Sequence, residues 1–332
     1  MISLAATLKT PRAKRIKRNI MFLKNAFRIS INNIGLSFKT ILYRLVVTVI
    51  AIVAVYFVCV GPLSVIVESG EFKAFMEDCQ EILQSIINGS FSQINGVKES
   101  FDALVALIVS NASSIRLSLI LVAVILLIRS YLEGICNYTV CVAVSDYMSS
   151  ISRTPFLRAL IANIAKSAVF EVIYLIAKVI VLAIAITLAV LCIVYTSSFL
   201  SVLSVIIAFW IVVLAVALFL SFTVTVRPSV VLGRKINEAF NFKTDAKTNA
   251  GVFASYVFSI VIAVAVNVGV LYTTFAAGLV VTLPATFVYF VCLQCVVFCS
   301  VDGRKYFVDY DNIVTPKKLR KEDDRLLTDV DI

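Results

Sequence analysis

The chain has 332 residues, of which 61% are hydrophobic and 15% charged, with a net charge of +10 and no histidine. Soluble domains are about 45–50% apolar and about 25% charged, so this composition excludes an ordinary soluble protein and is typical of a membrane protein. The lack of histidine removes the commonest general base and metal ligand. It therefore excludes HExxH metalloenzymes, Ser-His-Asp hydrolases and Cys/His zinc sites.

Six apolar segments are long enough to cross a membrane. A hydrocarbon core about 30 Å thick needs about 20 helical residues. The segments run approximately over 41–67, 115–144, 168–195, 198–226, 252–274 and 277–300. The sequence therefore predicts an all-α polytopic membrane protein with one membrane domain over 41–300. Because the first span is long and follows a basic stretch, we expect it to be an anchor and not a cleaved signal peptide.

The basic residues predict the orientation of these spans. Residues 1–44 carry ten Lys and Arg and no acidic residue, which indicates a cytoplasmic N-terminus. With six spans, the predicted cytoplasmic segments hold 26 Lys and Arg, whereas the external loop 68–114 holds two, together with seven acidic residues. We therefore expect a protein of the cell (plasma) membrane with both termini in the cytoplasm.

The basic segment 1–40 contains an amphipathic pattern. Its apolar residues recur at helical spacing, at Ile16, Ile20, Leu23 and Phe27. This pattern predicts a helix that lies in the membrane interface and contacts anionic head groups. Alternatively, the charges only enforce the orientation of insertion. Nucleic-acid binding is disfavoured because neither a recognised motif nor interleaved aromatic residues are present.

The external loop 68–114 and the tail 301–332 differ in character. Two apolar stripes in the loop, separated by Asn88-Gly89-Ser90, predict two short amphipathic helices. These helices are the predicted surface for a protein partner or for a second copy of the chain.

The tail is polar and charged, so we expect it to be largely disordered beyond about residue 316.

Four charged residues within the predicted spans are candidate functional residues: Arg129, Glu133, Glu171 and Lys178. A charge inside a membrane costs about 2.5–3.5 kcal/mol on insertion scales, so it is retained for pairing or for function. Arg129 and Glu133 are four residues apart, and Glu171 and Lys178 are seven apart, so each pair shares a helical face. The charges therefore form structural ion pairs or line a pathway for a substrate or an ion.

Other polar groups in the spans have simpler interpretations. Asn267 and Gln294 predict interhelical hydrogen bonds in the last two spans. Cys292, Cys295 and Cys299 share one helical face, where a metal site or palmitoylation is conceivable. We interpret these cysteines as small buried hydrophobic residues.

The connections between the spans carry several short motifs: Asp146-Tyr147-Met148-Ser149-Ser150, Thr154-Pro155-Phe156, Asn163 with Lys166, Arg227-Pro228-Ser229 and Asn237-Glu238-Ala239-Phe240. With these motifs the chain resembles a poorly characterised group of multi-pass membrane proteins from Gram-positive bacteria. It is also similar to the membrane domain of some glycerophosphodiester phosphodiesterases. The resemblance implies short amphipathic helices that alternate with pairs of spans. It implies no catalytic residues, because the phosphodiesterase chemistry belongs to a separate domain.

Two functions follow from these observations. The first is a non-enzymatic scaffold or accessory subunit that contacts anionic lipid and a protein partner. The second is a transporter or channel for a small solute or a lipid, with the four candidate charges along its route. This second function predicts a polar cavity enclosed by the second, third and fourth spans. An enzyme is disfavoured, and no cofactor or metal is predicted, because no acid–base pair or activated nucleophile is recognisable.

Overall fold

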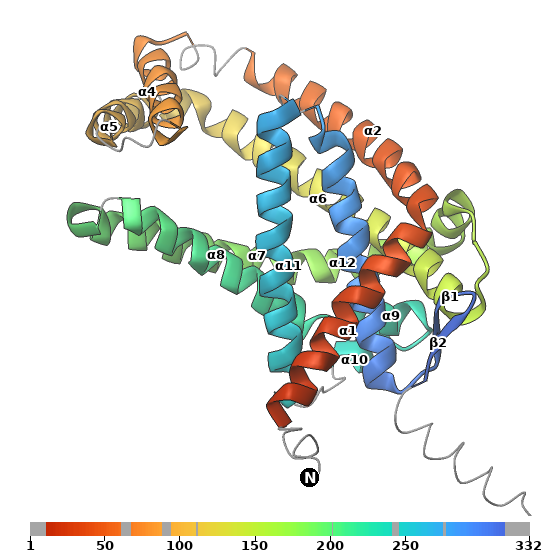
Figure 1. Cartoon of the computed structure of the whole chain (residues 1–332). Helices are drawn as coiled ribbons and strands as arrows, with labels where there is room; N and C mark the ends of the chain where they lie inside the picture. Colours follow the sequence, from red (N-terminus) through yellow and green to blue (C-terminus); the bar gives the residue numbers. More distant parts are fainter. Residues whose placement is uncertain are drawn as a thin grey trace, which may run out of the picture. The chain divides into compact units, whose positions relative to one another are not determined.

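The structure is a computed structural model that describes residues 11–60, 68–87, 94–110, 112–200, 202–240, 246–274 and 277–315 (Figure 1). Six helices in it are long and apolar enough to cross a membrane. They are α2 (Ile34–Cys59), α6 (Ala112–Ser150), α7 (Phe156–Leu200), α8 (Val202–Phe222), α11 (Ala246–Thr274) and α12 (Leu279–Asp302). The prediction of an all-α polytopic fold is confirmed, and the chain is a multi-pass membrane protein.

The chain contains seven further elements within its described residues. They are α1 (Pro11–Asn32), α4 (Gly70–Ile87), α5 (Ile94–Ser110), α9 (Val226–Val231), α10 (Ile236–Phe240), β1 (Tyr306–Asp309) and β2 (Asn312–Val314). The two strands pair in antiparallel orientation, with Tyr306 opposite Val314. The helices α4 and α5 match the two amphipathic helices predicted for the external loop.

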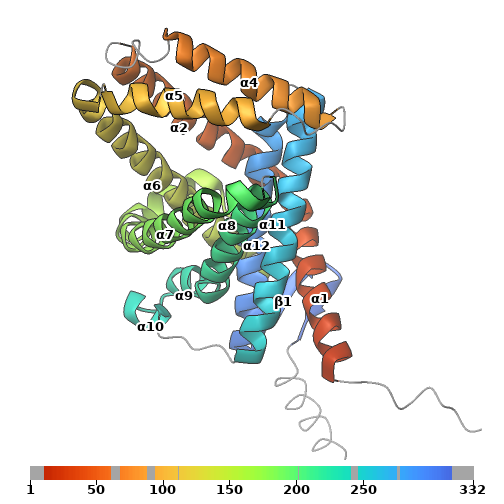
Figure 2. The same cartoon turned by 90° about the vertical axis from the view of Figure 1, so that its left-hand side faces the viewer.

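The chain divides into a first unit (residues 1–45 and 133–332) and a second unit (residues 46–132). In the second unit, α4 and α5 lie side by side (Figure 2). Leu104 is buried between them and contacts Phe72, Phe75 and Leu107. The ring of Phe75 also lies 5.9 Å from that of Phe101, measured between centroids. The predicted apolar stripes therefore join these two helices into a hairpin.

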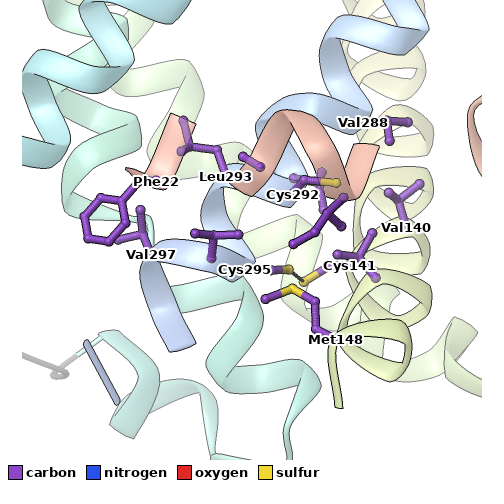
Figure 3. Packing of buried hydrophobic residues seen from close by; sticks show 14 of the residues in the cluster. Phe22, Val140, Cys141, Met148, Val288, Cys292, Leu293, Cys295 and Val297 are labelled. Atoms are coloured by element: carbon purple, nitrogen blue, oxygen red, sulfur yellow. Dashed lines mark hydrogen bonds between the residues drawn. The ribbon is translucent and has the colours of Figure 1, made fainter. Parts of the chain in front are cut away.

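The core of the first unit is built around α12. Half of the most apolar window of α12 is buried, compared with 11–22% of the corresponding windows in the other five candidate spans. Residues from α1, α6 and α11 pack against it, including Phe22 and Val140 (Figure 3). Tyr256 of α11 belongs to the same cluster. Because α12 is apolar on all faces and covered on most of them, it is the central helix of this unit.

The helices α7 and α8 form a closely packed hairpin. Small side chains are buried along it, namely Ala185 and Ala189 in α7 and Ser204, Ala208 and Ala217 in α8. Small residues let two membrane helices approach closely, so that van der Waals packing holds them together. The outward residues of both helices are large, apolar and exposed, as expected for a surface that faces lipid.

Three of the helices, α6, α7 and α11, are longer than the predicted spans. A separate amphipathic helix was expected after Pro155, but α7 continues without a break from Phe156 to Leu200. This stretch contains no Gly or Pro, so no residue in it interrupts the backbone hydrogen bonds. The amphipathic segment and the third span are therefore one helix.

The predicted N-terminal helix is present as α1, but a second stripe forms its buried face. Phe22, Ala26 and Ile29 are buried in the core, whereas Ile20 and Phe27 of the predicted stripe are exposed. The side chain of Ile16 lies outside the described residues. The helix therefore packs on the core with one stripe, and lipid contact by the other stripe stays a prediction.

The strands β1 and β2 were not predicted, and they bind the start of the tail to α1. Asn25 Nδ2 donates to the hydroxyl of Tyr306 at 3.0 Å, and Asn32 Nδ2 donates to the carbonyl of Val308 at 3.0 Å. Arg28 forms an ion pair with Asp309 at 2.9 Å. The tail is therefore ordered through Val314, and the disorder predicted beyond residue 316 lies outside the described residues.

Candidate functional site

An ion pair between Arg227 and Glu171 is the most buried charged contact of the first unit. Nε and Nη2 of Arg227 donate to the same Glu171 carboxylate oxygen at 3.0 and 2.9 Å. Glu171 is 2% exposed and Arg227 is 5% exposed. Hydrogen bonds between two charged groups are shorter and stronger than neutral ones. The pair therefore joins α9 to α7.

The same guanidinium group reaches a third helix. Nη1 of Arg227 donates to the amide oxygen of Gln294 in α12 at 3.2 Å. The carbon of the guanidinium lies 4.7 Å from the ring centroid of Tyr174, an arrangement that favours a cation–π contact. The Tyr174 hydroxyl is within hydrogen-bond distance of Thr223 Oγ1, at 3.2 Å. One arginine thus connects α7, α9 and α12, and its plane is covered by an aromatic ring.

A glycine gives the carboxylate its space. Gly134 in α6 lies directly against Glu171, and a Cβ atom at this position would overlap Glu171 Oε2. The backbone of α6 can approach the carboxylate this closely only because residue 134 has no side chain. Gly134 therefore makes α6 the fourth helix at this site.

A second pair involves Arg44 of α2. Its Nη1 lies 3.7 Å from a carboxylate oxygen of Glu133, and its Nη2 donates to Asn137 Oδ1 at 2.8 Å. The guanidinium carbon stacks 3.9 Å from the ring centroid of Phe287. Arg44 is 5% exposed, so it is a buried charge like Arg227.

Lys178 brings the two pairs together. This residue is half-buried in α7 and interacts electrostatically with Glu133 and Glu171, as well as with the two arginines. Five residues therefore form what we call the charge cluster: Arg44, Glu133, Glu171, Lys178 and Arg227. With three cations and two carboxylates, the cluster carries a formal charge of +1.

Three of the four candidate residues from the sequence, Glu133, Glu171 and Lys178, belong to the charge cluster. Arg129 lies in the second unit, one helical turn before Glu133 on α6. Arg44 and Arg227 were not among the candidate residues, because both were assigned to the positive charge of the cytoplasmic side. A signal was available, since Arg44 lies within the first predicted span and Arg227 follows the fourth span directly.

Two uncharged polar residues, Asn267 and Gln294, form hydrogen bonds between helices. Asn267 accepts a hydrogen bond from Thr282 Oγ1 at 2.7 Å, which links α11 to α12, and Gln294 links α12 to α9. The expected interhelical hydrogen bonds are therefore confirmed for both residues.

The cysteines lie mainly in the core. Cys292 and Cys295 are buried, and the sulfur of Cys295 lies 3.5 Å from that of Cys141 in α6 (Figure 3). Across the described ranges, no group of three or more Cys, Asp or Glu residues is placed to hold a metal ion. Cys292 and Cys295 are therefore buried as predicted, whereas Cys299 is only partly buried.

An apolar groove lies between α7 and α8, with a volume of about 560 Å³. Its walls include Val181 and Ala185 from α7 and Leu214 and Leu218 from α8. The transporter hypothesis predicted a polar cavity among the second, third and fourth spans. This groove between the third and fourth spans is lined by apolar side chains and is unsuited to a hydrated solute.

The motifs that carry the family resemblance have structural roles here. Thr154 Oγ1 donates to Asp146 Oδ2 at 2.5 Å, which closes the connection between α6 and α7. Phe156 is buried against the ring of Tyr43, and Arg227 forms the ion pair described above. Searches against family models, curated proteins and solved structures gave no match to this chain. The resemblance stays a prediction.

Proposed function

We propose that this multi-pass membrane protein is a non-enzymatic scaffold or accessory subunit of the plasma membrane, with both termini in the cytoplasm. The hydrogen bonds that join Glu171, Arg227 and Gln294 carry the proposal. They connect α7, α9 and α12, and a fourth helix packs against them at Gly134. In this proposal the charges fix the arrangement of the helices.

The surroundings of these charges support a structural role over transport. A residue that moves an ion or a polar solute needs contact with a hydrated route. Glu171 and Arg227 are instead buried against each other and against Tyr174, and the nearby groove between α7 and α8 is apolar. These observations disfavour a route that passes through this pair.

The second unit offers a surface for a partner. Phe101, Val105 and Val109 follow one another at four-residue spacing on α5, and all three are exposed. An apolar stripe on a helix is a common way to bind the groove of another protein. In the proposed orientation this stripe lies on the external side, where it would contact the partner of the scaffold.

The proposal is tested by chemical cross-linking in native membranes, followed by native gel electrophoresis of the full-length protein. We expect a complex of fixed stoichiometry that is larger than the 36.4 kDa chain. The variant Val109→Glu, at the most exposed position of the stripe, should dissociate it, because a buried charge without a partner opposes docking. The matched control is Ala103→Glu, an exposed position on another face of α5.

Flux measurements in proteoliposomes test the alternative function of a transporter. The scaffold proposal predicts that the purified protein gives no ion or solute flux above that of empty liposomes. A monomer in native membranes, together with a flux that the variant Glu171→Gln abolishes, would contradict the proposal and favour the transporter.

A further inference from the structure

The groove between α7 and α8 is about as long as the hydrocarbon layer of one leaflet is thick. Its α8 wall runs from Ile211 to Phe222, which corresponds to about 16 Å at 1.5 Å per residue. This is about half of the ~30 Å hydrocarbon thickness. One extended acyl chain of a phospholipid occupies the same length.

The groove occupies one half of α8. Measured from the start of α8 at Val202, Ile211 is about 14 Å along the helix and Phe222 about 30 Å. The groove therefore occupies the half of the span that ends beside α9. In the orientation proposed above, this half is the cytoplasmic leaflet.

Lys178 lies just beyond the end of this groove that is nearer to α9. It precedes Val181 by three residues and Ala185 by seven, so all three share one face of α7. Lys178 is also 22 residues before the end of α7 at Leu200, or about 33 Å by helical rise. In the orientation proposed above, with α7 across the membrane, Lys178 would lie at the level of the phosphate groups of the cytoplasmic leaflet.

From this geometry we propose that the groove binds one acyl chain of an anionic phospholipid, whose phosphate group contacts Lys178. The acyl chain would lie against the apolar side chains of the groove. The phosphate would then be near Lys178 together with Glu133 and Glu171. Because the charge cluster has a formal charge of +1, an anionic lipid complements it better than a zwitterionic one. This inference goes beyond the scaffold role and does not depend on it.

The test uses the purified full-length protein in nanodiscs with a photoreactive lipid. The probes are phosphatidylglycerol and phosphatidylcholine that carry the same diazirine in one acyl chain. After illumination, peptide mapping by mass spectrometry locates the adducts. We expect them on residues 181–188 and 211–222, with phosphatidylglycerol giving more adducts than phosphatidylcholine.

Two matched pairs of variants separate the groove from the general lipid-facing surface. Ile184 lines the groove and is 57% exposed, whereas Ile186 is 54% exposed and does not line it. Ile184→Trp should lower labelling of the groove about tenfold, because the larger ring fills the site. Ile186→Trp should leave the labelling unchanged. If Ile184→Trp does not elute as the native species on size exclusion, Leu214→Trp tests the same groove from α8.

The second pair tests the phosphate contact. Lys178→Gln should lower the ratio of phosphatidylglycerol to phosphatidylcholine labelling about fivefold, the contribution of one lysine near an anionic surface. Lys166→Gln, an exposed position on the same helix, should not change this ratio. Equal labelling of the Ile184→Trp and Ile186→Trp variants would overturn the proposal, as would an unchanged ratio in Lys178→Gln. A dimer that Ile184→Trp disrupts, without lipid adducts, would assign the groove to a second copy of the chain.

Discussion

The packing of α6 against Glu171 requires a glycine at position 134. Any Cβ atom there overlaps the Glu171 carboxylate, which Arg227 already holds in place. We expect Gly134→Ala to lower the free energy of unfolding by about 1–3 kcal/mol, the usual cost of overpacking a core. Thermal unfolding in detergent measures this change.

Gly269 of α11 provides the control for this substitution. A Cβ atom at Gly269 meets no other atom within 4 Å. Gly269→Ala should therefore leave stability unchanged or raise it by up to about 1 kcal/mol, because alanine favours the helix. If both variants had the same stability, the close contact between α6 and Glu171 would be refuted.

Tyr306 makes the docking of the tail sensitive to alkaline pH. Burial raises the pKa of Tyr306 from 10.0 to about 12, and its hydroxyl accepts a hydrogen bond from Asn25. The unfolded chain loses this phenolic proton near pH 10, before the folded chain does. The stabilisation from the neutral phenol is therefore complete below pH 10 and is lost as the pH rises through about 12.

Tyr306→Phe removes this titration. Between pH 9 and pH 11.5 we expect the melting temperature of the natural protein to fall more steeply than that of the variant. At pH 8 the variant should be less stable than the natural protein, by about 1 kcal/mol for the lost hydrogen bond. Parallel melting curves across this pH range would show that Tyr306 is not buried.

At the scale of elements, the packing of α6 on α12 brings two thiols together. The sulfur atoms of Cys141 and Cys295 are 3.5 Å apart in the core. A membrane-permeant oxidant such as iodine should accept two electrons from this pair and join the two helices by a disulfide. Peptide mapping after oxidation identifies the bond.

Cysteine variants check that this disulfide is specific. Cys141→Ser should abolish it, whereas Cys59→Ser, a position in the second unit, should leave it intact. A disulfide from Cys141 to any cysteine other than Cys295 would contradict the observed register of α6 and α12.

The elements differ in how well the sequence predicts them. Length and composition predict the six spans, and helical spacing predicts α1, α4 and α5, because these signals are local. The sequence does not single out α12 as the central helix, because all six spans are strongly apolar. It also misses β1 and β2, since a strand of three or four residues carries too little pattern and depends on contacts such as the hydrogen bond from Asn32 to Val308.

The candidate site was also predictable only in part, because some of its residues have a local signal and others depend on tertiary contacts. A charge inside an apolar run is visible in the sequence, so Glu171 and Lys178 were found. The partner of such a charge is set by tertiary packing. Arg227 is 56 residues from Glu171 in the chain, and only the fold brings the two together.

At the scale of the whole molecule, the chain leaves most of its apolar surface uncovered. In five of the six candidate spans, no more than 22% of the most apolar window is buried within the chain. Lipid or other protein chains must cover the remainder. Within the first unit, the charge cluster joins helices whose remaining surface is covered in this way.

The charge cluster should stabilise the arrangement of the helices. A double-mutant cycle tests it, by measuring the unfolding of the natural protein, Glu171→Gln, Arg227→Gln and the double variant. Each single variant should lose about 3–5 kcal/mol, because it leaves a buried charge without its partner. The double variant should lose less than the sum, with a coupling of about 1–3 kcal/mol. Lys166→Gln, an exposed position on α7, should have no effect. Single variants as stable as the natural protein, with no coupling between them, would contradict the claim.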